Sequence, residues 1–475
     1  MLGTIIRKEI HNSVVSFRFI VVLALLLILV PATVFILTND YVKKVEEFSV
    51  RRQGIEEYLK SYAHFNRLGG VVQPSQPPLP AMALVRGISS DVGLEDFEDD
   101  PLPVMFPLLD LVFVVAILLS LAALIFSYDA VSGEKEDGTL KLMLANSLPR
   151  YQILLGKIFG GTLTLFIPFL VSMFLGLIVI LVNPRVNWTG TNWGSLGLVL
   201  GGAAVYIFFF EALGVLISSR HHSSSASIMT SLCLWVLLVL VIPNLSPYLA
   251  SLLSPAPSRI KVNREVSRLT DVERDKLGQQ LRADKMRDLV KRYPLLAYPI
   301  SEAEAKTKAE KDPAFREAVA ARTREIQEVW DEANRIQGEK AEVLRAELNR
   351  KEAAQTRLAG IVSMISPLTD FTYWATDLTS TGLRNISHFK DLSDRWGRSY
   401  GEYARAKTAA LQKKDPAVDW WNTAVDVSDM PRFEYKEEAL AARFRSALGP
   451  LTVLLVMAVG AFAAAYLSFI RTDPR

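Results

Sequence analysis

The sequence predicts an all-α membrane protein with six transmembrane helices and an extracytoplasmic domain made of a helical hairpin and a cap. Three observations lead to this fold class. Half of the 475 residues are hydrophobic and only 22% are charged, which gives a mean hydropathy of +0.22. The apolar residues gather in six runs near the length of ~20 residues that a membrane-spanning helix needs. The runs are continuous rather than alternating, which excludes a β-barrel.

The six runs are the predicted transmembrane segments 19–37, 104–127, 153–182, 196–217, 226–248 and 448–470. The first run is not expected to be a cleaved signal peptide, because no small-residue cleavage site follows it. The single cysteine, Cys233, falls in the fifth run, so no disulfide within the chain is possible. A net charge of +3 over this length gives no indication of nucleic-acid binding.

Lysine and arginine in short loops predict the orientation, because they are enriched on the cytoplasmic side. With a cytoplasmic N-terminus, the inside segments hold Arg7, Lys8, Arg18, Lys135, Lys141, Arg150, Arg220, Arg471 and Arg475. The one short outside loop, 183–195, holds only Arg185. We therefore expect both termini in the cytoplasm, with segments 38–103 and 249–447 outside.

Residues 1–18 precede the first span with apolar residues at spacings of three and four and with charges on the other side. This pattern predicts an amphipathic helix that lies in the membrane interface. A simple extension of the first span is the alternative, and the charges of Arg7, Lys8 and Glu9 favour the interfacial helix.

The outside segment 38–103 combines a helix with a proline-rich loop. Tyr41–Leu68 has apolar residues at near-helical spacing, and Gly69-Gly70 ends the pattern. Gln73–Pro80 (QPSQPPLP) predicts a stiff, extended strap. A loop that covers the outer domain is favoured over a ligand for a proline-binding partner.

The segment 249–447 is long enough to form a domain of its own. Arg259–Tyr293 and Asp312–Ile365 are charged and have helical periodicity, and a proline-containing break separates them. They predict an antiparallel helical hairpin at about 259–365, with a parallel coiled-coil dimer as the weaker alternative because the heptads are irregular. The aromatic-rich remainder, about 366–447, predicts a compact cap near the membrane surface.

No catalytic or metal-binding pattern is present in the sequence. The five histidines form no HExxH pair, and one cysteine allows no zinc-site spacing. There is no Gly-x-Ser-x-Gly motif. The phosphate-binding pattern GxxxxGK[ST] is also absent, because Ile158 follows Gly156-Lys157. We therefore expect no enzyme activity and no cofactor in this chain.

Two acidic residues lie within predicted spans, where an unpaired charge is costly and often functional. Asp110 is close to the outer end of the second span, where an interfacial position would also explain it. Glu211 is deeper, in FFFEALG, and either lines a translocation path or bonds a neighbouring helix.

The loop 128–152 between the second and third spans carries most of the charge in this part of the chain. Gly138 follows the charged run at Glu134, Thr139 can cap a helix over Leu140–Asn146, and Pro149 ends that helix. The pattern predicts a short amphipathic helix parallel to the cytoplasmic face. An ordinary loop would not need exposed leucines there, so a docking role is favoured.

The string SGEKEDGTLKLMLANSLPRYQILLGK resembles the signature of permease subunits of type-2 ABC exporters. The matching residues are Glu134, Gly138, Thr139, Leu140, Leu144, Pro149, Arg150, Leu155, Gly156 and Lys157. The sequence FEALGVLIS, which begins at Phe210, also fits the family. The long insertion before the last span resembles a subgroup, as do SPLTDF at Ser366 and PRFEY at Pro431.

The resemblance implies that this loop holds a coupling helix that seats in a groove of a separate ATPase, which binds ATP and Mg²⁺. It also implies a bacterial inner-membrane location and pairing with a second permease subunit, identical or related. The expected function is half of an export path that is driven through the 128–157 loop. The alternative is a mechanotransmitter that passes ATPase motion to an extracytoplasmic envelope partner without transport. No motif supports a membrane enzyme.

Overall fold

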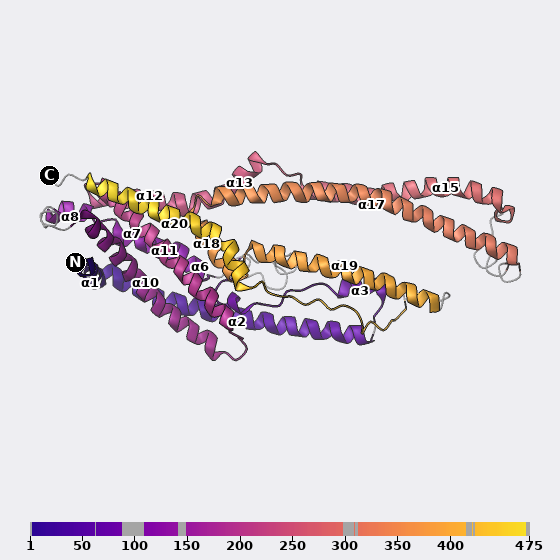
Figure 1. Ribbon diagram of the computed structural model, residues 1–475, viewed down its shortest axis with the longest axis horizontal. Helices are drawn as coiled ribbons and strands as arrows, with labels where there is room; N and C mark the ends of the chain where they lie inside the picture. Colours follow the sequence, from indigo (N-terminus) through magenta and orange to yellow (C-terminus); the bar gives the residue numbers. More distant parts are fainter. Residues whose placement is uncertain are drawn as a thin grey trace. The chain divides into compact units, whose positions relative to one another are not determined.

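The computed structural model describes residues 2–61, 63–87, 109–140, 149–297, 308, 312–414, 420 and 423–471. Within these ranges the regular structure is entirely helical, which confirms the predicted all-α class. The chain divides into two compact units, Met1–Pro243 with Met364–Arg475, and Asn244–Ser363. Figure 1 shows the labelled helices of both units.

Six helical stretches are long and apolar enough to span a membrane, as predicted. They are Phe17–Lys60 in α2 (Phe17–Ser61), Leu111–Glu136, α10 (Arg150–Val182), α11 (Gly190–Arg220), Ser224–Leu253 and α20 (Leu440–Ile470). The second comprises α6 (Leu111–Phe113), π-helix η2 (Val114–Leu119), α7 (Ser120–Ser127) and α8 (Ser132–Glu136). The fifth comprises α12 (Ser224–Trp235), π-helix η3 (Val236–Val241) and α13 (Ile242–Leu253).

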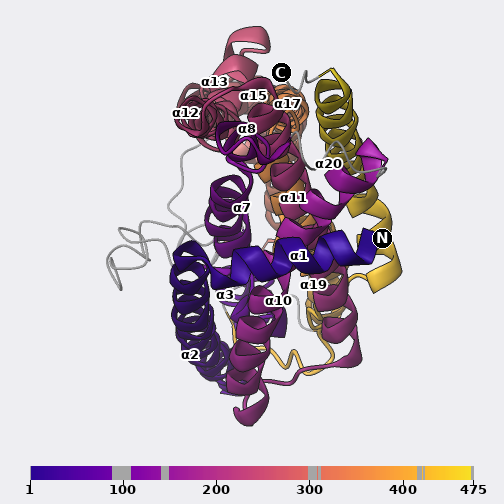
Figure 2. The ribbon, with the colours of Figure 1, turned by 90° about the vertical axis from the view of Figure 1, so that its left-hand side faces the viewer.

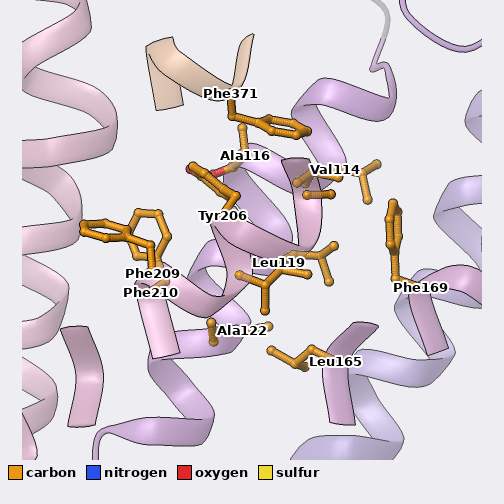
Figure 3. Close-up of a cluster of buried hydrophobic side chains, with 14 of the residues drawn as sticks. Val114, Ala116, Leu119, Ala122, Leu165, Phe169, Tyr206, Phe209, Phe210 and Phe371 are labelled. Carbon is orange, nitrogen blue, oxygen red and sulfur yellow. The ribbon is translucent and has the colours of Figure 1, made fainter. Parts of the chain in front are cut away.

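The core of the first unit is built around α11. Its aromatic residues Tyr206, Phe209 and Phe210 are buried together with Leu119 of η2 and Phe169 of α10 (Figure 3). The Tyr206 hydroxyl donates to the carbonyl oxygen of Ala116 at 2.8 Å, within the π-helix of the second span. This bond gives the buried hydroxyl an acceptor inside the apolar core.

Small residues let the other helices approach α10 closely. The N-terminal helix α1 (Leu2–Val15) crosses α10 (Figure 2) and packs on it. A Cβ on Gly156 would overlap Ile5, and one on Gly160 would lie 2.7 Å from the Cβ of Glu9. Glycines at these positions are therefore required for the close packing of α1 on α10.

The helix of the first predicted span continues beyond residue 37. We expected a span at 19–37 and a helical segment from Tyr41 to Leu68, and α2 joins most of both in one helix of 45 residues. The polar residues between Leu37 and Tyr41 contain no glycine or proline, so nothing there ends the helix. A short helix, α3 (Phe65–Val71), follows after a break.

A second, smaller core joins the C-terminal part of α2 to α3 and α19 (Leu383–Lys414). Its buried residues are Leu59, Ala63, Phe65, Leu68, Val427 and Met430. Figure 1 shows α3 between α2 and α19. The backbone N–H of Val425 donates to the carbonyl oxygen of Ala63 at 2.8 Å, which ties the segment before α20 to the same core.

The region 366–447, expected to be a compact cap, consists of two different parts. Helix α18 (Pro367–Leu378) packs into the main bundle, where Trp374 Nε1 donates to the carbonyl oxygen of Leu198 on α11 at 3.0 Å. Helix α19 instead has no fully buried residue. The proline-rich strap ends at Pro80, where 3-10 helix η1 (Pro80–Ala83) begins, and it meets α19 where Asn385 Nδ2 donates to Gln76 Oε1 at 3.1 Å.

The second unit forms an antiparallel helical hairpin, as the sequence predicts. One arm consists of α14 (Arg259–Ser267), π-helix η4 (Arg268–Glu273) and α15 (Arg274–Arg292), and 3-10 helix η5 (Pro294–Leu296) follows it. The other arm is α17 (Pro313–Ser363). Arg259 pairs with Glu352 at 2.6 Å, and Arg292 pairs with Glu325 at 2.6 Å, so the two arms run in opposite directions.

Candidate coupling site

The predicted coupling loop follows α7, and its described part ends at Leu140. Helices α8 and α1 lie at the same end of the first unit (Figure 1). Residues 141–148, which include Leu144 and most of the predicted amphipathic helix, lie outside the described residues. What the structure describes is how the flanks of this segment are attached to the bundle.

Lys157, about two turns into α10, joins three elements through a buried ion triad. Its Nζ lies 2.7 Å from Glu134 Oε1 on α8 and 3.3 Å from Glu9 Oε1 on α1. The lysine side chain is 4% exposed, and both glutamate side chains are 18% exposed. We call these three residues the ion triad. Breaking such a buried pair is costly because it leaves a charge without compensation.

The same loop is attached to the turn between α11 and α12. Backbone N–H groups of Val131 and Ser132 donate to the Ser218 hydroxyl at 3.0 and 2.9 Å. Lys135 Nζ donates to the carbonyl oxygen of Ser219 at 2.6 Å. The Glu136 carboxylate accepts from both the backbone N–H and the hydroxyl of Ser224, at 3.0 and 2.6 Å. The loop thus contacts α11 and α12 in addition to α1 and α10.

Arg18, at the start of α2, makes a further connection to the beginning of the loop. Its guanidinium pairs with Asp129 at 2.8 Å and donates to the Tyr128 hydroxyl at 2.8 Å. It also lies 4.9 Å from the centre of the Tyr128 ring, a cation–π distance. These contacts fix the start of the first span against the end of the second.

The described tip of the loop is exposed at Glu136, Asp137, Gly138 and Thr139. Gly138 has φ of +69°, a left-handed conformation that favours glycine. Thr139 Oγ1 donates to the carbonyl oxygen of Glu134 at 3.4 Å. Leu140, expected to be exposed for docking, is instead 2% exposed and belongs to the same apolar core as Val131.

Pro149 and Arg150 begin α10, at the far flank of the loop. Pro149 precedes the first helical residue, where its missing N–H removes no helix bond. Arg150 Nη1 donates to the carbonyl oxygen of Ile470 at 2.6 Å, at the end of α20. A cation at a helix C-terminus meets carbonyl groups that the helix itself leaves unpaired.

The two acidic candidates of the spans occupy different environments. The Asp110 carboxylate accepts from the backbone N–H of Phe113 at 2.8 Å and so caps the start of α6. Glu211 is 2% exposed and faces Gly161 of α10. The structure therefore brings Glu211 to the neighbouring helix, next to the turn that carries Lys157.

Among the predicted site residues, the structure brings Glu134 and Lys157 into contact with each other. This contact is buried and does not belong to the exposed tip of the loop. The sequence prediction missed Glu9, Arg18 and Asp129. The sequence shows that these charged residues flank apolar runs. It does not show that Glu9 contacts Lys157, because the two residues are too far apart in the chain for any local spacing to relate them. Among the described residues, no cluster of three or more histidine, cysteine or acidic side chains has the geometry to hold a metal ion.

Comparison with known proteins defines the class. The family model described as "ABC-2 family transporter protein" matches residues 3–474. The chain therefore belongs to the ABC-2 transporter family and is a multi-pass transmembrane permease subunit of an ABC transporter.

Two curated relatives carry the printed description "Probable ABC transporter permease protein NosY". The one from Pseudomonas aeruginosa is 36% identical over 125 residues, and the one from Stutzerimonas stutzeri is 32% identical over 124 residues. In both cases the aligned stretch is 26% of this chain and 45% of the relative. The chain thus spans less than half the length of the curated relatives it matches.

Proposed function

We propose that the chain is the transmembrane subunit of an ATP-driven exporter and that the 128–157 loop couples it to a separate ATPase, which binds ATP and Mg²⁺. The observation that carries this proposal is the attachment of the loop. Its exposed tip, residues 136–139, is continuous with α8, which the ion triad connects to α1 and α10. A displacement of the tip would therefore move several spans together, as a coupling element requires.

The proposal includes an orientation and an assembly. The distribution of lysine and arginine supports cytoplasmic termini in a bacterial inner membrane. A second permease subunit, identical or related, would complete the translocation path. Large apolar side chains exposed along Ser224–Leu253 support this pairing, since they need either lipid or another subunit to cover them; they include Met229, Val236, Leu240, Leu249 and Leu252.

Mechanotransmission is the second candidate, and the length of α2 favours it. This helix runs from the Arg18 contact with the loop to Ser61, and its C-terminal part shares the second core with α19. A continuous helix of 45 residues could pass motion from the ATPase to an extracytoplasmic partner without moving a substrate.

The coupling assignment is tested by purifying the chain with its ATPase after the tip has been changed. We expect the double variant Asp137→Arg with Thr139→Arg to lose ATPase binding at least tenfold, because both side chains are exposed. A separate Leu144→Asp variant probes the rest of the loop. The control is Arg185→Glu, which changes an exposed charge in the loop between α10 and α11. Unchanged ATPase binding in both loop variants would refute the assignment.

Hydrogen–deuterium exchange separates the two functions. Mechanotransmission predicts that ATP changes exchange in 38–61 and 383–414, and that Val50→Pro in α2 abolishes this response while ATPase binding remains. An export path predicts ATP-dependent changes that concentrate in the spans and survive Val50→Pro. Val50 suits this test because its side chain is exposed and the substitution removes no core contact.

A further inference from the structure

Glu211 is a buried acid whose surroundings point to Lys157. It lies in the C-terminal third of α11, and its Oε1 atom has no hydrogen-bond partner among the described residues. Its carboxylate is packed on Gly161, where any Cβ would overlap the Glu211 oxygens. No lysine, arginine or histidine in the described part of the chain lies within ion-pair distance of it, yet an unpaired acid inside a membrane bundle is costly.

Lys157 lies on α10 between the two surfaces that the glycines define. Gly156 and Gly160 face α1, whereas Gly161 faces Glu211. With 3.6 residues per turn, the Lys157 side chain points about 60° from Gly160 and about 40° from Gly161 around the helix axis. Viewed along the axis of α10, the lysine therefore points between Glu9 on α1, one of its present partners, and the Glu211 carboxyl on α11.

The lysine can reach both positions. Cβ atoms four residues apart on a helix are about 5–6 Å apart, and the Glu211 carboxyl occupies the place that a Gly161 Cβ would take. The flexible four-carbon stem of lysine spans such a distance by changing rotamers. Residues 160 and 161 of α10 place no side chain between Lys157 and Glu211, because both are glycine.

The two sets of partners differ in their access to water. Glu9 and Glu134 are partly exposed, so water can solvate them when the ammonium leaves. Glu211 is nearly inaccessible to water and gains a charge partner only if a cation comes to it. Lys157 would therefore have a charged partner in both arrangements of the loop, first Glu9 with Glu134 and then Glu211. A two-state element requires such differential contacts in each state.

We propose that Glu211 is the alternative partner of Lys157 and positions its ammonium when the loop and α1 move away during the ATPase cycle. We take the Glu211 carboxyl to be neutral while no cation lies beside it, because an unpaired charge inside a membrane bundle is costly. When the ammonium arrives, the proton of the Glu211 carboxyl passes to a released carboxylate, Glu9 or Glu134, so the net charge of the four groups is unchanged. The proposal rests on the proposed coupling function and adds a residue of α11 to it.

Cross-linking in the full complex with the ATPase tests the exchange. In a Cys233→Ser background, the pair Glu9→Cys with Lys157→Cys should cross-link with a short thiol reagent in the nucleotide-free complex, where the two positions are in contact. An ATP analogue should lower the yield at least fivefold, because the exchange requires α1 to move away from α10. The control pair Lys157→Cys with Asp370→Cys places the second thiol on α18 and should not respond to nucleotide. Equal yields with and without nucleotide would overturn the proposal.

ATP turnover of the same complex gives a second readout that needs no cysteine. Glu211→Gln keeps the shape of the side chain, so the chain should fold and bind the ATPase while coupled turnover falls about tenfold. Because Lys157→Met already removes the exchange, adding Glu211→Gln to it should cause no further loss. Asp370→Asn is the matched control for loss of a buried acid and should leave turnover unchanged.

The outcomes distinguish this inference from the function on which it rests. If the wild-type chain fails to bind the ATPase, the coupling function is wrong. If it binds, and Glu211→Gln has wild-type turnover or multiplies the effect of Lys157→Met, only the exchange is wrong. If Glu211→Gln does not fold, Glu211→Asp replaces it in the test. This variant keeps the carboxyl on a shorter side chain and should reduce turnover by less than the tenfold expected for Glu211→Gln. Wild-type turnover of Glu211→Asp would refute the exchange.

Discussion

Lys157 Nζ and Glu134 Oε1 lie 2.7 Å apart across 23 positions of sequence, and this contact attaches the start of α10 to the loop that precedes it. Glu9 of α1 approaches the same ammonium at 3.3 Å. One side chain therefore holds the N-terminal helix, the loop and a spanning helix together. With two carboxylates around one ammonium, the triad has one excess negative charge, and loss of the lysine raises this excess to two.

The first prediction concerns this lysine. Lys157→Met should destabilise the chain by about 3 kcal/mol or more, because it leaves two carboxylates facing an apolar stem. Thermal unfolding of the purified chain in detergent measures the loss. The control, Lys43→Met, removes an ammonium that is 65% exposed and should change stability by less than about 0.5 kcal/mol. A Lys157→Met variant as stable as the control would show that the triad is not a stabilising contact.

The second prediction concerns the exposed turn at Gly138. A Cβ at this position meets nothing within 4 Å, so the effect of Gly138→Ala comes only from the left-handed backbone. Strain of about 1 kcal/mol should change the loop conformation and weaken ATPase binding severalfold, with little change in the unfolding temperature of the bundle. Binding of the purified ATPase, measured by titration, provides the test.

The matched control for Gly138 is Gly133→Ala, five residues earlier in the same loop. Gly133 lies in α8, its φ is not in the left-handed region, and a Cβ there would make only an ordinary contact with Asp129 at 3.5 Å. This variant should bind the ATPase as the wild type does. Equal weakening by both variants would mean that the loop is sensitive to any added side chain and not to the turn.

The spans were predictable because an apolar run long enough to cross a membrane is a local property of the sequence. Helix α10, for example, begins only three residues before its predicted start at 153. The hairpin was also predictable, since the helical periodicity of its arms and the break between them are local. For the same reason, the signature residues of the loop could be recognised without knowledge of their contacts.

The contacts that define the site could not be predicted, because they join distant parts of the chain. Glu9 and Lys157 are 148 positions apart, and each reads as an ordinary charge near a membrane surface. Trp374 was expected to belong to a cap near the surface, yet it packs on Gly202 of α11. That position depends on a glycine in another helix, which no periodicity within 366–447 could reveal.

The third prediction uses Asp370, which is fully buried on α18 with neither carboxyl oxygen hydrogen-bonded to a described residue. Burial raises the pKa of Asp370 to about 8, well above its ordinary value of 3.8. The folded state therefore binds the proton more tightly than the unfolded state. The resulting stability is fully present below pH 4 and is lost as the pH rises through about 8.

The unfolding temperature of the wild type should accordingly fall between pH 5 and pH 9, by an amount that reflects a few kcal/mol. Asp370→Asn cannot ionise and should remove most of this decline, so its advantage over the wild type should grow with pH. Asp377, whose pKa burial raises to about 6, would contribute a smaller decline that remains in the variant. Parallel pH profiles for Asp370→Asn and the wild type would show that Asp370 is not responsible.

The fourth prediction concerns the second core, where Leu68 of α3 is completely buried. Leu68→Ala should cost about 2–5 kcal/mol, as for other large-to-small changes in packed cores. Because this core is separate from that of the main bundle, the loss should appear as local opening. Hydrogen–deuterium exchange should increase in 55–72, 400–411 and 425–430, while the spans keep their protection.

The control for Leu68 is Val50→Ala, on the part of α2 that precedes the second core. Val50 is 64% exposed, so its truncation removes little buried surface and should leave exchange in the same segments unchanged. If Leu68→Ala instead raised exchange equally in α10 and α11, the two cores would unfold as one cooperative unit. In that case the C-terminal part of α2 would be rigidly coupled to the bundle, because the loss of one buried leucine could not open it independently.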